Sequence, residues 1–249
     1  GSLALAALIA RARRGSDRPQ AKLDGRRKRP LLVHQSVLAH HTLQVVPPPL
    51  TSQRLYSCLH YNPMQTLTVP QGEFKLARYP YRAKEQLRAW DAADEYLLHH
   101  LHDEGLPAQN AAMLILNDDS GALATALAPH HPQALSDSYL THQATLANLQ
   151  HNDHAPDDIR LLHSLAEPTG PLDLILCKIP KSLAFLEDLL QRIRPHLHAA
   201  TPLIGAGMAR NIHTSTLELF ERIIGPTRTS LAQKKARLIF STYHNALDP

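Results

Sequence analysis

The chain has 249 residues, of which 43% are hydrophobic and 19% charged, so it can bury a core and is not disordered throughout. Its net charge of +4 is unevenly distributed: residues 1–63 carry 10 Lys and Arg against 2 Asp, whereas residues 64–249 carry 16 against 20 Asp and Glu. The basic balance therefore belongs to the first quarter of the chain, and no global positive field indicates a nucleic-acid-binding protein.

Hydropathy and cysteine content exclude further classes. No run of 18 apolar residues predicts a membrane span, and Cys58 and Cys177 are too few for a disulfide framework or a Cys-rich zinc site. The helical histidines His99, His100 and His102 lack the i, i+4 spacing of metal ligands. We therefore expect a cytoplasmic protein with no membrane contact and no metal.

Residues 1–63 differ in character from the rest. They contain the basic run 26–29, the triple proline 47–49 and little hydrophobic periodicity, so they cannot bury enough apolar surface to offset the entropy of ordering. We expect a basic, disordered extension, or a segment translated from a misplaced start, since Met64 is the first methionine. A basic arm that binds RNA is the alternative.

From Met64 onward, helical and strand patterns alternate. Hydrophobic spacing predicts helices over 87–101, 122–128, 140–150, 182–194 and from 215 to the Gly225-Pro226 stop. Short apolar runs predict strands over 112–116, 159–162, 172–177 and 202–206, with a further strand ending before Asp137. Ser215 and Glu218 have the spacing of a capping box. Residues 227–232 and 236–242 flank a turn and predict a closing hairpin.

This order predicts an α/β fold with a mostly parallel, doubly wound sheet. A C-terminal antiparallel hairpin on such a sheet is the arrangement of Rossmann-like S-adenosylmethionine-dependent methyltransferases. The pattern alone does not separate that fold from other nucleotide-binding α/β folds.

The predicted cofactor turn is degenerate. A ligand in this fold lies at the carboxyl ends of the strands, where a turn of several glycines lets the backbone approach it. Here the turn 117–121 reads Asn117-Asp118-Asp119-Ser120-Gly121, so only one glycine is left. A structural turn explains these residues as well as a ligand does. Asp137, at the end of the next strand, is placed to bind ribose hydroxyls or to cap the following helix.

The fourth strand leads into a turn that does not suit catalysis. Methyltransferases that act on base amines carry an Asn-Pro-Pro-aromatic motif there, which holds the exocyclic amine and stacks on the base. This chain has Lys178-Ile179-Pro180-Lys181 instead, and lysine ammonium groups cannot accept a hydrogen bond from an amine. At the hairpin tip, Lys234, Lys235 and Arg237 are candidates for phosphate contact, although charged hairpin tips are common.

Several short stretches carry a resemblance to a known family. They are residues 89–98 (AWDAADEYLL), 114–118 (LILND), 178–181 (KIPK) and 210–221 (RNIHTSTLELFE), the last followed by Gly225-Pro226 and 234–239 (KKARLI). Over residues 64–242 the chain closely resembles the N-terminal half of the bacterial ribosomal RNA large subunit methyltransferase G family. Residues 1–63 have no counterpart in that resemblance.

The resemblance implies a duplicated methyltransferase fold. Family members transfer a methyl group from S-adenosylmethionine to a guanine N2 of 23S rRNA. Their C-terminal copy holds the glycine-rich cofactor loop and the Asn-Pro-Pro-Phe motif, and the N-terminal copy has lost both. This chain contains neither motif, so no catalytic residue of the family carries over. We expect residues 64–249 to be the degenerate N-terminal domain, with the catalytic C-terminal domain absent from this sequence.

Three interpretations remain open at this point. The first is a non-catalytic domain that engages 23S rRNA and assists the catalytic domain in cis. Its candidate RNA contacts are Lys178, Lys181, Arg210, Lys234, Lys235 and Arg237. The second is a copy that still binds S-adenosylmethionine through the turn around Asn117, Asp119 and Gly121, together with Asp137. The third is a purely structural domain that supports the catalytic copy. We expect no cofactor on this chain itself.

Overall fold

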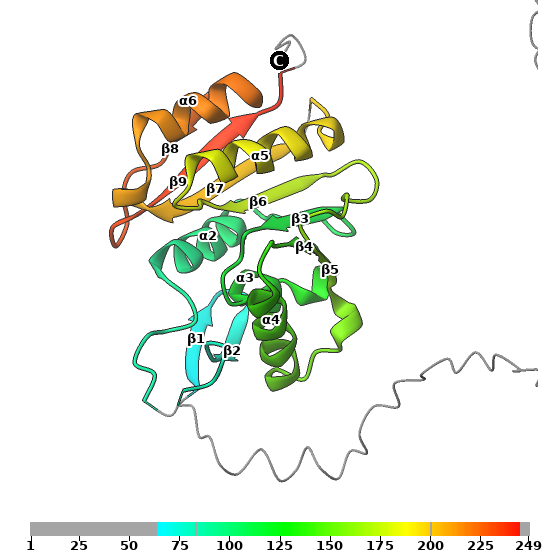
Figure 1. Cartoon of the computed structure of the whole chain (residues 1–249), viewed down its shortest axis with the longest axis vertical. Coiled ribbons are helices and arrows are strands. Elements are labelled where there is room, and N and C mark those ends of the chain that lie inside the picture. The colour runs from blue at the N-terminus through cyan, green and yellow to red at the C-terminus, as the bar shows by residue number, and fades with distance from the viewer. Residues whose placement is uncertain (1–63, 83, 200, 245–249) are drawn as a thin grey trace, which may run out of the picture. The chain divides into compact units, whose positions relative to one another are not determined.

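The computed structural model describes residues 64–244 with the exception of 83 and 200 (Figure 1). The predictions for residues 1–63 therefore lie outside the described residues. Unlike the predicted patterns, which begin with a helix, the described chain begins with an antiparallel ribbon of β1 (Gln65–Val69) and β2 (Gly72–Leu76). No helix among these residues is long and apolar enough to cross a membrane.

A seven-stranded sheet forms the centre of the fold, in the order β5-β4-β3-β6-β7-β9-β8. Its strands are β3 (Met113–Leu116), β4 (Gln133–Leu135), β5 (Arg160–Leu162), β6 (Leu174–Lys178), β7 (Pro202–Met208), β8 (Thr227–Thr229) and β9 (Ala236–Thr242). The first five pair in parallel, whereas β9 runs antiparallel to both β7 and β8. The predicted parallel sheet with a C-terminal antiparallel hairpin is confirmed.

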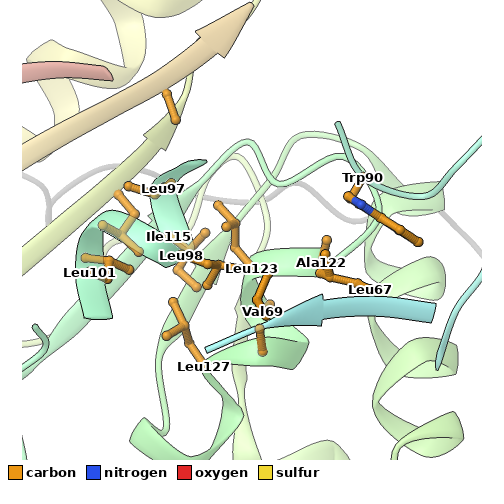
Figure 2. Close-up of a cluster of buried hydrophobic side chains, with 14 of the residues drawn as sticks. Leu67, Val69, Trp90, Leu97, Leu98, Leu101, Ile115, Ala122, Leu123 and Leu127 are labelled. Atoms are coloured by element: carbon orange, nitrogen blue, oxygen red, sulfur yellow. The ribbon is translucent and has the colours of Figure 1, made fainter. Parts of the chain in front are cut away.

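Two helical layers cover the sheet (Figure 1). On one face lie α2 (Ala92–Asp103), α3 (Ala122–Ala126) and α4 (Tyr139–His151), and on the other lie α5 (Leu183–Ile193) and α6 (Thr214–Ile223). Every residue of the central strands β3 and β6 is buried, as parallel strands covered on both faces require. Figure 2 shows Leu97, Ile115 and Leu123 meeting in the core of the first face.

The β1–β2 ribbon completes this first core. Leu67, Val69, Phe74 and Leu76 are buried at alternate positions, and the residues between them face solvent. Asn152, the C-cap residue of α4, accepts a hydrogen bond from the Lys75 amide at 2.7 Å and donates one to the Lys75 carbonyl at 2.9 Å. The amide side chain thus pairs with the edge of β2 as another strand would.

Helix starts differ from the sequence prediction in three places. The helix expected from residue 87 begins at Ala92, because the Asp91 side chain caps it, and Leu87 is left 64% exposed. The predicted Ser215–Glu218 capping box is wrong: α6 begins at Thr214, and the Thr216 hydroxyl accepts from the His213 amide at 3.3 Å. Helix α4 is capped by Ser138, which accepts from the Thr141 amide, and not by Asp137.

Candidate nucleic-acid interface and the strand-end site

The turn after β3 is held by its own side chains. Asn117, at φ +58°, donates its side-chain amide to the Lys178 carbonyl at 3.1 Å and so joins the ends of β3 and β6. Asp118 is 5% exposed, and its carboxylate accepts from the amides of Ala122 at 3.2 Å and Ala124 at 2.9 Å. The Asp118 side chain thus caps α3, in agreement with the structural interpretation of this turn.

Burial dominates the electrostatics of Asp118. Removal from water, together with the nearby Asp94 carboxylate, raises the pKa of Asp118 to about 7. Burial also raises the pKa of Asp94, which is 4% exposed, although the Lys178 ammonium works against that rise. Two carboxyl groups are therefore enclosed where a cofactor-binding member of this fold would hold its ligand.

Lys178 lies between the two acidic residues at the start of α2. Its Nζ is 2.8 Å from an oxygen of Asp91 and 2.8 Å from an oxygen of Asp94, and its side chain is 9% exposed. Burial alone works to lower the pKa of Lys178, but the two carboxylates outweigh it and hold the pKa above its ordinary value. The expectation that Lys178 is a surface contact for RNA is therefore wrong, because the ammonium is enclosed and paired.

Gly121 is explained by helix packing. Its φ of +74° is left-handed, and a Cβ added there would lie 2.5 Å from Thr145 Oγ1 and 2.6 Å from Thr145 Cα. The glycine lets α4 pack directly on the start of α3, so its missing side chain serves the protein's own packing. Asp119 is exposed, and its carbonyl accepts from the Thr141 hydroxyl at 3.1 Å, which fixes the same two segments.

A small cavity lies at this strand end. The cavity next to Asp118 and Ser136 has a volume of about 10 Å³, whereas pockets for ligands of that size measure roughly 300–1,000 Å³. Asp137 is exposed and lies outside its lining. A larger hollow of about 380 Å³ lies at the opposite edge of the sheet, near Pro202 and Thr242.

The β8–β9 connection is a tight turn made of two lysines. Gln233 and Ala236 exchange backbone hydrogen bonds of 2.9 and 2.7 Å across it. Lys234 and Lys235 both have positive φ angles, +47° and +66°, which defines a type I′ turn. Such turns favour Asn-Gly because the left-handed conformation strains other residues by roughly 1 kcal/mol each. Two exposed lysines occupy these positions despite that strain.

The lysine turn packs against the start of α2. Glu95 accepts from Lys234 Nζ at 3.0 Å, Trp90 Nε1 at 3.0 Å and Arg88 Nη1 at 3.1 Å. The Tyr96 hydroxyl donates to the Leu231 carbonyl at 3.3 Å. Burial works to raise the pKa of Glu95, but hydrogen bonds from Lys234 and Trp90 outweigh it and lower the pKa. Sequence reasoning missed Arg88, because it lies within the predicted helix 87–101 and no sequence pattern links it to Glu95 or to the lysine turn.

The other predicted contacts lie at different distances from this turn. Arg210 is exposed in the segment that is joined to the turn by the Ala209 amide, which donates to the Lys235 carbonyl at 2.7 Å. Arg237 is exposed, but it alternates with Ala236 and Leu238 and so projects from the opposite face of β9. Lys181 is exposed in the separate turn between β6 and α5. Arg88, Arg210, Lys234 and Lys235 are thus the exposed cations linked to this turn.

The strand order, the C-terminal antiparallel hairpin and the position of the strand-end turn define the class of S-adenosylmethionine-dependent methyltransferase folds. Solved structures agree. The T. thermophilus 16S rRNA N2 methyltransferase RsmC, in complex with AdoMet and guanosine, has a TM-score of 0.58 at 16% identity over 73% of this chain and 50% of that chain. Precorrin-6y C5,15-methyltransferase from Geobacter metallireducens has a TM-score of 0.50 at 10% identity, over 69% and 95%.

Residues 64–245 match the family described as the RLMG N-terminal domain, and the chain belongs to that family. It is 54% identical over 186 residues to the ribosomal RNA large subunit methyltransferase G of Streptomyces griseus, covering 74% of this chain and 48% of that protein. The protein of the same name from Erwinia tasmaniensis is 49% identical over 181 residues, covering 72% and 48%. The chain spans about half the length of these relatives.

Proposed function

We propose that this chain is the N-terminal, non-catalytic domain of a 23S rRNA guanine-N2 methyltransferase and that it engages the RNA. The catalytic domain, which uses S-adenosylmethionine, would lie in the other half of the same cytoplasmic protein. Support comes from the family match and from the names of the curated relatives, whose length this chain covers by about half.

The observation that carries the RNA proposal is the strained lysine turn. Lys234 and Lys235 hold left-handed conformations that Asn and Gly would adopt with less strain. Backbone strain of this kind is typical of positions kept for function. The turn also joins Arg88 and Arg210, which come from two distant parts of the chain. Positive side chains gathered on one protrusion suit contact with the phosphate groups of RNA.

The proposal that this domain is not catalytic rests on the strand-end site. Asp118, Gly121 and Lys178 are all engaged with the chain's own groups there. The remaining cavity of about 10 Å³ cannot admit a nucleoside. An enzyme of this fold would need that position for its cofactor.

The RNA proposal is tested by salt-dependent binding of the 249-residue chain to transcripts of 23S rRNA, measured by fluorescence anisotropy. Replacing Arg210, Lys234 and Lys235 by alanine should weaken binding and lower the slope of log affinity against log salt by about 0.7–0.9 for each lost phosphate contact. The matched control removes Lys75 and Arg160, which are exposed on β2 and β5. Equal binding by the triple variant and the wild type would refute the proposal.

One observation favours a second candidate, a structural domain that supports the catalytic copy. Large apolar side chains are exposed at the carboxyl edge of the sheet, in the segments that follow the strands. They are Tyr139 at 72%, Leu140 at 50%, Leu165 at 86%, Leu183 at 40% and Leu231 at 86%. Exposed apolar groups often mark a protein contact. If this were the domain's only role, the chain would show no RNA affinity at any salt concentration.

A further inference from the structure

We propose that Arg88, Trp90 and Lys234 form a phosphate-binding site in which the Glu95 carboxylate takes the place of the phosphate until RNA arrives. The inference rests on the proposed RNA function and adds where one phosphate binds and what it displaces. It makes Glu95 an internal competitor of the RNA.

The geometry around Glu95 is that of an anion site. Three N–H donors converge on one carboxylate within 3.1 Å: an ammonium, an indole and a guanidinium. The donors come from two segments far apart in sequence, residues 88–90 and the lysine turn. A phosphate group has the same charge sign and more acceptor oxygens, and Arg and Lys both bind it well.

The formal charges around Glu95 sum to a net positive charge. Arg88 and Lys234 contribute two positive charges and Glu95 one negative charge, so the site is net positive before RNA binds. The side chains of Arg88 and Lys234 are 50% and 77% exposed, so a phosphate can reach them from solvent. The Glu95 side chain is 17% exposed and lies at the base of the site. An exposed ion pair of this kind is weak, which makes exchange of one anion for another feasible.

The fluorescence of Trp90 can report directly on the occupancy of this site. It is the single tryptophan of the chain, its indole N–H donates to Glu95, and the Arg88 guanidinium lies 5.3 Å from its ring centroid. Trp90 is 7% exposed and belongs to the same buried hydrophobic cluster as Leu67 and Ala122 (Figure 2). A change of its hydrogen-bond partner should therefore alter the tryptophan emission without any label.

The test compares tryptophan emission of the wild-type chain and Glu95→Gln during titration with inorganic phosphate and, separately, with an rRNA transcript. The amide oxygen of Gln still accepts from Trp90, but the competing charge is gone. We expect saturable emission changes at lower phosphate concentration in Glu95→Gln. RNA affinity should rise by about threefold to fivefold, and the salt slope should become steeper by about 0.7–0.9.

The matched control is Glu104→Gln at the far end of α2, about 14 Å along the helix and beyond the screening length at physiological salt. It should leave both titrations unchanged. Lys234→Met provides a second variant and should abolish the phosphate response of Trp90. Equal effects of Glu95→Gln and Glu104→Gln, or a wild-type phosphate response in Lys234→Met, would overturn the inference. Loss of RNA binding in the Arg210, Lys234 and Lys235 triple variant would still uphold the proposed function independently.

Discussion

At the scale of single residues, Lys178 decides how the strand-end site is interpreted. The lysine ends a fully buried strand and faces Asp91 and Asp94, three residues apart at the start of α2. The Lys178 and Asp94 charges are buried and are tolerated because they pair with each other, since an isolated buried charge is costly. The network engages these three side chains with one another at the strand end.

Lys178→Met should therefore destabilise the chain by about 3 kcal/mol, because it leaves the Asp94 carboxylate buried without its cation. The double variant Lys178→Met with Asp94→Asn should recover part of that loss, since it removes the orphaned charge. Urea unfolding followed by circular dichroism gives both values. A single variant as stable as the wild type would show that the network is not needed for stability.

Asp118 predicts a pH dependence of stability. Its pKa of about 7 in the folded chain lies above the value of about 4 for an unfolded Asp, so the folded state holds an extra proton between these values. The contribution of this group to stability is present below pH 4 and is lost as the pH rises toward 7. Asp118→Asn removes the titration and keeps one cap acceptor, so its stability relative to the wild type should increase from pH 5 to pH 8.

Asp119→Asn serves as the matched control for that series, because the neighbouring Asp119 side chain is exposed. Urea midpoints at several pH values between 5 and 8 give the comparison. Parallel pH profiles for Asp118→Asn and the wild type would contradict the assignment of a buried, protonated Asp118.

At the scale of elements, glycine and turn positions carry the tightest constraints. Gly121 and Gly170 have nearly the same left-handed φ, +74° and +71°, but only Gly121 has a neighbour in the way of a Cβ. Alanine at either position should cost the strain of that conformation, roughly 1 kcal/mol. Gly121→Ala should cost about 2 kcal/mol more than Gly170→Ala, because it also forces α3 and α4 apart. Equal unfolding free energies of the two variants would refute the close α3–α4 packing.

The lysine turn should show opposite effects on stability and binding. Lys234→Asn combined with Lys235→Gly gives the turn the residues that type I′ geometry favours, and should raise stability by about 1 kcal/mol. The same double variant should weaken RNA binding and flatten its salt dependence. Thermal unfolding and anisotropy on one preparation test both effects. A fall in stability with unchanged RNA affinity would indicate that the lysines serve the hairpin and not the RNA.

Element order was the part of the fold most open to prediction. Buried strands such as β3 and β6 are continuous apolar runs, and the hairpin is marked by two strand-like segments around a short turn. The β1–β2 ribbon was missed although its apolar residues alternate with period two, because Leu67, Val69, Phe74 and Leu76 give each strand only two core side chains. Helix starts depended on caps such as Asp91, whose side-chain contacts no periodicity reports.

The site was harder to predict because pairing across the fold decides what a charged residue does. Lys178 follows an apolar run, and Asp91 and Asp94 open a helix, but nothing in the sequence joins residues so far apart. The same holds for Glu95 and Lys234. Charge at a hairpin tip did indicate Lys234 and Lys235 correctly as exposed cations, whereas Arg88 was found only through its contact with Glu95.

At the scale of the whole molecule, the chain's own side chains occupy one end of a methyltransferase-like sheet. The chain belongs to the RlmG N-terminal domain family and keeps the strand order of the fold. Asp118 and Lys178 lie at the carboxyl ends of the strands, where Gly121 packs against Thr145. The exposed cations Lys234 and Lys235 lie at the β8–β9 turn. The proposed function thus assigns contact with RNA to this domain and cofactor binding to the other half of the protein.

The most direct test of this account is a calorimetric titration of the 249-residue chain with S-adenosylmethionine. The account predicts no saturable heat up to millimolar ligand, because the space at the strand ends measures about 10 Å³. A one-site binding curve would contradict it, and would show that the turn 117–121 opens to admit the cofactor.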